Sequence, residues 1–318
     1  MTFDPQVRAL LDNLAHMPQP DFDTLSPEVY RAILAQMPPF APGDAMAHER
    51  ALTIPGAAGP LPAHLYVPHG DGPWPLTVFF HGGGFVTCGI ETHHNLCRSL
   101  AQRAGTIVLS VAYRLAPEAP FPAAAEDACA AVRWAASHAE ELGALGVHTG
   151  ALAVAGDSAG ANLAAVAAQQ LRGKVALCHQ LLLYPYLDCA DESGSVQAFA
   201  QGCFLTLEQL RWYSRHYLSN AHDATDVRAS PLRNADLAGI APATIITAEY
   251  DPLRDQGERY GERLTHASVA ATVHRWPGQI HGFMSMLGLL DGAEAAVNTA
   301  AAALRNAFAN PMHMRVYA

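Results

Sequence analysis

The sequence predicts an α/β fold in which a mostly parallel sheet is covered by helices on both faces. Short β-rich runs alternate with helical patterns along most of the chain, an order typical of parallel βαβ units with right-handed crossovers. Most of the runs are continuously apolar, which indicates strands buried on both sides. The 318 residues are 50% hydrophobic, enough for a large core, and α/β folds of this length often form one domain.

Strands and helices can be assigned in chain order from these runs. The predicted strands are 61–68, 75–80, 106–111, 151–156, 179–185, 243–249 and 269–276. The first of them alternates between polar and apolar residues, as an edge strand does. The helical patterns between and after the strands are 91–104, 122–142, 158–172, 255–267 and 292–309.

Two further segments differ from this alternation. Residues 1–45 are proline-rich, with helical patterns at 5–16 and 27–37, the second beginning well with Ser-Pro-Glu. The interval 186–242 has no clear strand, and 204–218 reads as a helix rich in aromatic residues. We expect residues 1–45 and about 186–222 to form a helical cap over a core of 46–185 and about 223–318.

Charge and composition exclude several classes of protein. The formal net charge of -10 and the lack of a basic patch argue against nucleic-acid binding. The N-terminus lacks the basic and then apolar regions of a signal peptide, and no run reaches the roughly 18 apolar residues of a membrane span. We therefore expect a cytoplasmic protein acting on a small molecule, with a homodimer left open.

The cysteines and histidines give no clear metal signal. The six cysteines have no Cys-x-x-Cys spacing, which argues against a zinc site or a disulfide framework. The pair His93–His94 with Cys97 has loose helical spacing and no carboxylates to complete it, so we expect no metal.

Polar and glycine residues gather where the predicted strands end, the edge at which such sheets bind ligands. "HGGGF", His81 to Phe85, follows one strand, and its uncovered backbone N–H groups suit a developing oxyanion. The alternatives are a flexible turn, or His81 as a metal ligand.

The sequence "GDSAG", residues 156–160, lies between a predicted strand and a predicted helix. This is the setting that the G-x-S-x-G motif requires to hold a serine nucleophile at a sharp turn. The alternative is that Asp157 or Ser158 caps the helix.

An acid and a histidine follow later strands. Asp251 comes directly after the strand 243–249, with Asp255 as a weaker candidate that could cap the next helix. His281 follows the last strand. The chain order Ser158, Asp251, His281 is that of α/β-hydrolase catalytic triads.

These motifs resemble the hormone-sensitive-lipase-like family, whose bacterial members are the family IV carboxylesterases. The resemblance runs from about residue 25 to 308, through "HGGGF", "YRLAPEAPFPAA", "GDSAGANLA", "SPL", "AEYDPLRDQG" and "HGF". It implies an α/β-hydrolase fold with an eight-stranded, mostly parallel sheet and a helical cap.

The resemblance also implies roles for single residues. Ser158 would be the nucleophile, Asp251 the acid and His281 the base. The oxyanion hole would comprise the N–H groups of Gly83, Gly84 and Ala159. In "YRLAPEAPFP", we expect Tyr113, Arg114 and Glu118 to brace the glycine loop rather than bind substrate.

The chemistry expected of these residues is ester hydrolysis through an acyl-enzyme, without a cofactor. Apolar side chains near the site are candidates for the walls of the substrate pocket: Phe85, Tyr186, Phe204, Leu205 and Phe283. An amidase or arylformamidase would use the same triad. A non-catalytic receptor, such as the gibberellin receptors that resemble this family, would lack the histidine that this chain has at position 281.

Overall fold

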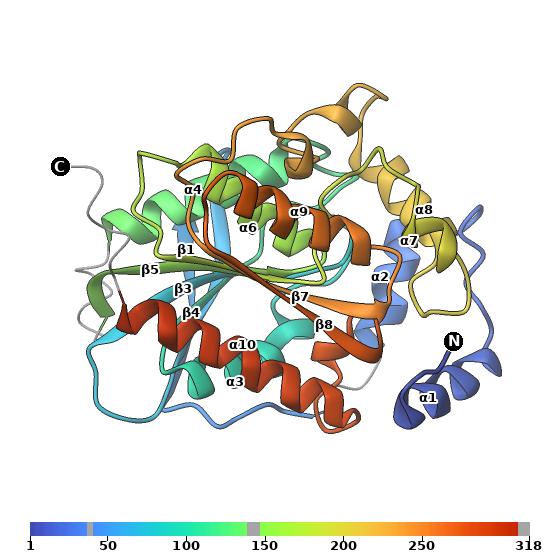
Figure 1. Cartoon of the computed structure of the whole chain (residues 1–318), viewed down its shortest axis with the longest axis horizontal. Helices are drawn as coiled ribbons and strands as arrows, with labels where there is room; N and C mark the ends of the chain where they lie inside the picture. The colour runs from blue at the N-terminus through green and yellow to red at the C-terminus, as the bar shows by residue number, and fades with distance from the viewer. Residues whose placement is uncertain (37–40, 139–146, 311–318) are drawn as a thin grey trace.

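An eight-stranded sheet crosses the centre of the computed structural model, which describes residues 1–36, 41–138 and 147–310 (Figure 1). The strand order is β1-β2-β4-β3-β5-β6-β7-β8. The pairs β1–β2 and β2–β4 are antiparallel and all other neighbours are parallel. The strands are β1 (His48–Pro55), β2 (Pro60–Val67), β3 (Trp74–Phe80), β4 (Ile107–Val111), β5 (Val147–Asp157), β6 (His179–Leu183), β7 (Ala243–Tyr250) and β8 (Ala271–Ile280).

Helices cover both faces of the sheet, as the continuous apolar strands predict. One face packs against α3 (His94–Ala104) and α10 (Asp291–Ala309). The other face packs against α4 (Ala123–Ser137), α6 (Ala159–Gln170) and α9 (Arg254–His266). The result is two apolar cores, one on each side of the sheet (Figure 1).

The predicted strands are all present, and two features of the sheet differ from the prediction. The strand β1, His48–Pro55, precedes the first predicted strand and is not among those assigned from the sequence. The last strand, β8, was expected to end at 276 but continues through Pro277 to Ile280. β8 is the edge of the sheet, where a missing backbone N–H is tolerated. The last residues of the predicted helix 122–142, 139–142, lie outside the described residues.

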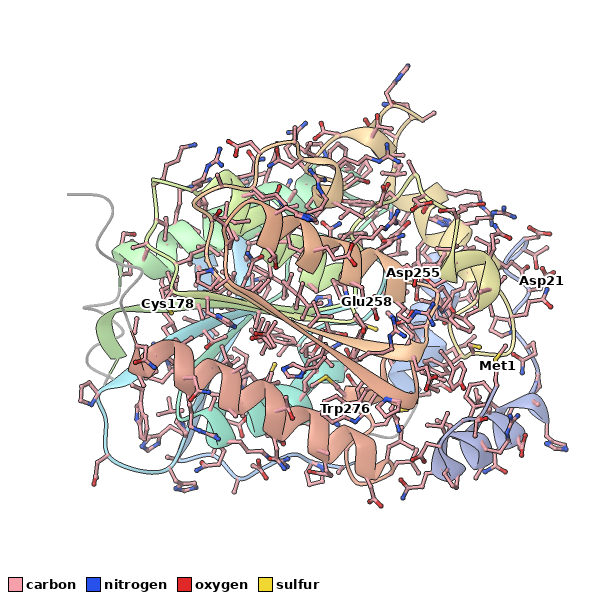
Figure 2. The ribbon with its side chains drawn as sticks, in the orientation of Figure 1. Met1, Asp21, Cys178, Asp255, Glu258 and Trp276 are labelled. Carbon is pink, nitrogen blue, oxygen red and sulfur yellow. The ribbon has the colours of Figure 1, made fainter. Side chains whose placement is uncertain are left out.

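Four more helices lie where the strands β5 to β8 end (Figure 1). They are α1 (Pro5–Ala15), α2 (Pro27–Gln36), α7 (Ser195–Ala198) and α8 (Leu207–Tyr217). Figure 2 shows the two ends of the sheet, with Cys178 at the start of β6 and Asp255 beyond the end of β7.

An aromatic cluster joins the N-terminal segment to α8. The rings of Phe22 and Tyr30 lie 5.8 and 5.5 Å from the ring of Trp212. The indole N–H of Trp212 also donates a hydrogen bond to the carbonyl of Leu25, at 3.0 Å. The two segments that the sequence set apart from the core therefore pack on each other. Among the helices in the described part of the chain, none is long and apolar enough to cross a membrane.

The first turn of α6 packs tightly against the end of β3, and this contact yields a prediction. A Cβ on Gly160 would lie 1.9 Å from the carbonyl oxygen of Phe80 and 2.6 Å from that of His81. Because both atoms are backbone, we expect Gly160→Ala to lower the free energy of unfolding by about 3 kcal/mol. Urea titration of the purified variant measures this change.

The matched control is Gly89→Ala, whose Cβ would meet only the flexible Glu91 carboxylate, at 3.2 Å. We expect that variant to change the free energy of unfolding by less than about 1 kcal/mol. Equal stability of the two variants would contradict the assigned contact.

Candidate active site

Ser158 lies at a sharp turn between β5 and α6. Its backbone angles, φ 53° and ψ -117°, are rare for a residue other than glycine. The turn is held by the N–H of Ser158, which donates to the carbonyl of Leu183 at 2.8 Å. Gly156 and Gly160 flank it because a Cβ on either would clash with backbone atoms. Neither Asp157 nor Ser158 caps α6 through its side chain, so the helix-cap alternative is wrong.

The structure brings Ser158, His281 and Asp251 into one chain of hydrogen bonds. Nε2 of His281 lies 2.9 Å from Oγ of Ser158, and Nδ1 of His281 lies 2.8 Å from Oδ2 of Asp251. The other oxygen of Asp251 accepts the N–H of Leu253 at 2.8 Å. Asp251 is fully buried and His281 is 8% exposed, so this chain is largely shielded from water.

The second acidic candidate, Asp255, serves another purpose. It lies inside the first turn of α9, and Leu253 is the residue at the cap position. Its carboxylate accepts the N–H of Ser195 at 2.9 Å and that of the Arg254 guanidinium at 2.9 Å. Asp255 therefore fixes the start of α7 to α9, rather than capping the helix or contacting His281.

The glycine loop after β3 approaches the same place. Gly83 and Gly84 have φ of 111° and 59°, the region that favours glycine. A Cβ on Gly83 would lie 2.2 Å from the carbonyl of Thr87, and one on Gly84 would lie 2.2 Å from the ring of Tyr213. Within the described chain, the N–H groups of Gly83, Gly84 and Ala159 donate to no other protein atom. These donors are available to a ligand.

A buried ion pair links the glycine loop to the serine turn. Oδ1 of Asp157 accepts the N–H of Gly82 at 2.8 Å and lies 3.0 Å from Nε2 of His93. Burial disfavours both charges, but the carboxylate raises the pKa of His93 above its usual value, and the imidazolium lowers the pKa of Asp157. Sequence reasoning treated these two residues only as a possible metal ligand and a helix cap.

The turn after β4 braces the glycine loop through Tyr113. Its hydroxyl donates to the carbonyl of His81 at 2.8 Å, and its ring stacks on the His81 imidazole at 4.4 Å. Burial lowers the pKa of His81 to about 4, and its Nδ1 lies 2.7 Å from the Gly82 carbonyl. Among the residues that the structure describes, His81 belongs to no cluster of three or more candidate metal ligands. Arg114 and Glu118 do not reach the glycines: they pair with Asp127 and Arg31.

Ser158 opens into a cavity of about 220 Å³ beneath α2 and α8. Tyr186, Phe204 and Leu205 line it, as predicted, together with Gly83, Gly84 and His281. Phe85 and Phe283 do not line it, which corrects the prediction. Phe85 stacks on Tyr217 at 3.9 Å, and Phe283 is fully buried beside Trp276 and Tyr184.

Three polar residues in the wall of this cavity were missed from the sequence. The side-chain amide of Gln209 donates to the hydroxyl of Tyr30 at 2.8 Å and to that of Tyr213 at 3.4 Å. Gln209 and Tyr213 share one face of α8, four residues apart, but Tyr30 comes from α2. No local motif marks such a contact between distant segments.

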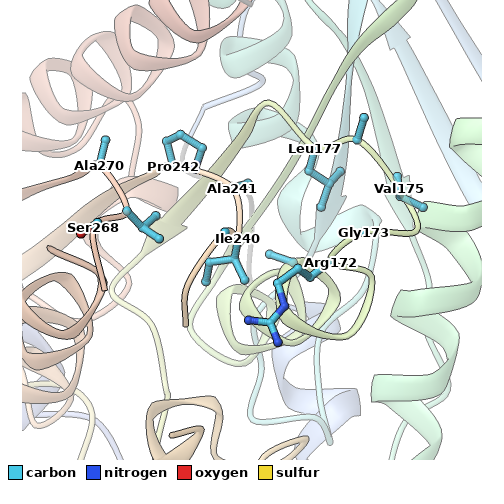
Figure 3. Close-up of a pocket in the computed structure, with 13 residues that line it drawn as sticks. Arg172, Gly173, Val175, Leu177, Ile240, Ala241, Pro242, Ser268 and Ala270 are labelled. Carbon is cyan, nitrogen blue, oxygen red and sulfur yellow. The ribbon is translucent and has the colours of Figure 1, made fainter. Parts of the chain in front are cut away.

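A second cavity, of about 240 Å³, lies at the other ends of the parallel strands, away from Ser158 (Figure 3). It is formed where the chain enters β6, β7 and β8, and its walls are mostly apolar. Its charged residue, Arg172, is already bound to Asp236 and to the carbonyl of Ala238. The wall of this cavity has one serine, Ser268, but no histidine or carboxylate to activate it, in contrast to the Ser158 cavity, which is the candidate site.

Comparison with known proteins identifies the family of this chain. A family described as alpha/beta hydrolase fold matches residues 77–285. The chain is 44% identical over 262 residues to the carboxylic ester hydrolase LipN of Mycobacterium tuberculosis, covering 80% of this chain and 69% of LipN. It is 39% identical over 240 residues to an ethyl acetate hydrolase of Pseudomonas putida, covering 74% of each protein. A solved hyperthermophilic esterase from Pyrobaculum calidifontis superposes with a TM-score of 0.89 at 39% identity, covering 96% of this chain and 99% of the esterase.

The chain therefore belongs to the α/β-hydrolase fold family. Within that family it is a member of the hormone-sensitive-lipase-like group, bacterial family IV, which confirms the resemblance seen in the sequence motifs.

The His93–Asp157 pair predicts a specific dependence of stability on pH. The raised pKa of His93 stabilises the folded state fully below the pKa of histidine in the unfolded chain, about 6.5. This stabilisation is lost as pH rises through the pKa of His93 in the folded protein. The lowered pKa of Asp157 stabilises the folded state above about pH 3.9, the pKa of aspartate in the unfolded chain. This stabilisation is lost as pH falls through the pKa of Asp157 in the folded protein. The pair therefore stabilises most between about pH 4 and 6.5.

We expect His93→Gln to lower the free energy of unfolding by about 3 kcal/mol at mildly acidic pH and by less in mild alkali. Urea titrations on both sides of neutrality measure the difference. His69→Gln, at an exposed histidine, is the control and should be near neutral at both values. A loss that grows with rising pH would show that the pair is not charged as described.

Proposed function

We propose that this protein hydrolyses short- to medium-chain acyl esters through a covalent acyl-enzyme on Ser158. The observation that carries the proposal is the hydrogen-bonded chain from Ser158 through His281 to Asp251, which opens into a cavity with unused N–H donors. The protein is an enzyme of the carboxylic ester hydrolase class, as its relatives are.

His281 is placed to act as the base. Its Nε2 takes the proton of the Ser158 hydroxyl while Oγ attacks the ester carbonyl, and the same nitrogen then gives the proton to the leaving alcohol. Asp251 accepts from Nδ1, which fixes the tautomer and stabilises the imidazolium. Water repeats the sequence on the acyl-enzyme and releases the acid.

Gly83, Gly84 and Ala159 would supply the oxyanion hole. Their N–H groups have no acceptor within the described chain, and the first two border the Ser158 cavity. Such donors stabilise the negative charge that develops on the carbonyl oxygen, because they are already oriented before the reaction. No cofactor enters the mechanism.

The cavity supports a small acyl group. Its volume of about 220 Å³ is below the roughly 300–1,000 Å³ of pockets for drug-sized ligands. We propose that residues 1–45 and about 186–222 form the helical cap that closes it, since α2 supplies Tyr30, α8 supplies Gln209, and Leu205 lies just before α8. A homodimer and a cytoplasmic location stay proposals from the sequence.

The alternatives differ in the leaving group or in catalysis itself. An amidase or arylformamidase would use the same three residues, and nothing in the cavity favours an amide. A receptor of the same fold needs no histidine bonded to the serine, so the contact between His281 and Ser158 favours an enzyme.

We expect Ser158→Ala to reduce ester hydrolysis by about 10⁶-fold, because the nucleophile is lost. The measurement is a series of p-nitrophenyl esters of increasing chain length, which should be cleaved fastest at roughly four to eight acyl carbons. Near-normal turnover by the folded variant would contradict the mechanism. Faster cleavage of an emulsified long-chain triglyceride than of a soluble butyrate ester would contradict the chain-length preference.

Two matched amide substitutions test the choice of acid. Asp251→Asn should lower kcat by about 10⁴-fold, because an amide favours the wrong imidazole tautomer. Asp255→Asn should leave kcat within about tenfold, since that residue contacts Ser195 and Arg254 rather than His281. Both are measured on stable protein with one ester. A larger loss in Asp255→Asn would mean that the wrong carboxylate was chosen.

A further inference from the structure

A second cluster of ionisable groups lies at the antiparallel edge of the sheet, outside the Ser158 cavity. It comprises Glu49 from β1, His64 from β2 and His94 at the start of α3. One ring nitrogen of each histidine and one oxygen of Glu49 all lie within 4.8 Å of one another. Nε2 of His64 is 3.3 Å from Oε2 of Glu49, and the two imidazole rings meet edge to face at 5.2 Å.

The register of the two strands puts the cluster on one face. Glu49 pairs with Tyr66, and Ala51 pairs with His64. Side chains alternate between faces along a strand, so Glu49, His64 and Tyr66 point to the same side, toward α3. The side chains of His64 and Glu49 are 19% and 28% exposed, which leaves them open to a solute.

Neighbouring residues hold the cluster in the way that protein metal ligands are held. The hydroxyl of the buried Tyr66 lies 2.5 Å from Nδ1 of His94. A histidine that binds a metal usually donates its other ring N–H to an oxygen acceptor, which fixes the tautomer. Arg98, one turn after His94, holds both oxygens of Glu49, at 3.0 and 3.1 Å, and orients the carboxylate.

We propose that Glu49, His64 and His94 bind a divalent transition-metal ion such as Zn²⁺, which ties β1 and β2 to the start of α3. Two imidazoles and one carboxylate are a donor set that zinc accepts, with water in the fourth position, whereas magnesium and calcium prefer oxygen ligands alone. The phenol of Tyr66 leaves Nε2 of His94 for the metal. Arg98 retains one oxygen of Glu49, and its charge limits the affinity.

No sequence motif marks this site, because its members are far apart in the chain. The expectation of no metal rested on His93, His94 and Cys97. In the structure, His93 turns to Asp157 and Cys97 is fully buried, while His94 turns to Tyr66 on β2.

The test is titration of the full-length, tag-free and chelator-treated protein with Zn²⁺ alone, followed by calorimetry. We expect one principal site per chain, weakened about 100-fold by His64→Gln or by His94→Gln and about tenfold by Tyr66→Phe. Co²⁺ in place of Zn²⁺ should give visible absorption bands that both histidine variants lack. Zn²⁺ should also raise the melting temperature of the wild type by more than that of the His64 and His94 variants, since it binds the folded state.

His69→Gln and His274→Gln are the matched controls, and both should bind Zn²⁺ like the wild type. Unchanged ester hydrolysis without metal verifies that each variant is folded. The proposal is overturned if the wild type binds no Zn²⁺ in the micromolar range. It is also overturned if the His64 and His94 variants bind as tightly as the controls, which would place the metal elsewhere, for example at His281.

Discussion

The carboxylate of Asp157 joins the two turns on which the site depends. Asp157 directly precedes Ser158 in the chain, and its carboxylate accepts the N–H of Gly82. Gly82 in turn directly precedes Gly83 and Gly84, the two glycines of the proposed oxyanion hole. A buried carboxylate is costly unless it is paired, and His93 supplies the partner. Ser158 and the N–H groups of the glycine loop are therefore set relative to each other by one side chain that takes no part in the hydrogen-bonded chain of Ser158, His281 and Asp251.

Consecutive residues at the start of α3 belong to two different environments. His93 ends the short 3₁₀ turn Glu91–His93 and points to Asp157, whereas His94 begins α3 and points to Tyr66 on β2. Successive residues of a helix point about 100° apart, so one helix start can serve two sites. In the sequence the pair, with Cys97, is considered only as one candidate metal motif and is rejected, and spacing alone does not show that the two imidazoles point to different neighbours.

The parts of the site that the sequence predicted are those with a local cause. Ser158, Asp251 and His281 each follow a strand of a parallel sheet, and the ends of such strands meet at one edge. The fold class could also be predicted, because the alternation of strands and helices is a pattern among residues that are neighbours in the chain. Pro277 was taken for a strand end because the sequence does not show that β8 lies at the edge.

The parts that were missed depend on packing between distant segments. Tyr30 and Gln209 meet across 179 positions of chain, which no pattern of neighbours can show. Phe85 looked like a pocket wall, but its φ of 64° belongs to a turn that stacks its ring on Tyr217 instead. An apolar side chain near a site carries no mark of which way it faces.

The attachment of the N-terminal segment bears on how the chain acquires its structure. Arg31 of α2 donates to the carbonyls of Val86 and Ala116 and pairs with Glu118, while the carbonyl of Leu25 receives the indole of Trp212. The N–H of Asp4 donates to the carbonyl of Gly278 in β8, the last strand of the sheet. During synthesis these first residues emerge long before their partners, and closing such long loops is slow. The N-terminal segment can therefore complete its contacts only after Trp212 and Gly278 have been synthesised, whereas the partners of Arg31 lie within 87 residues of it.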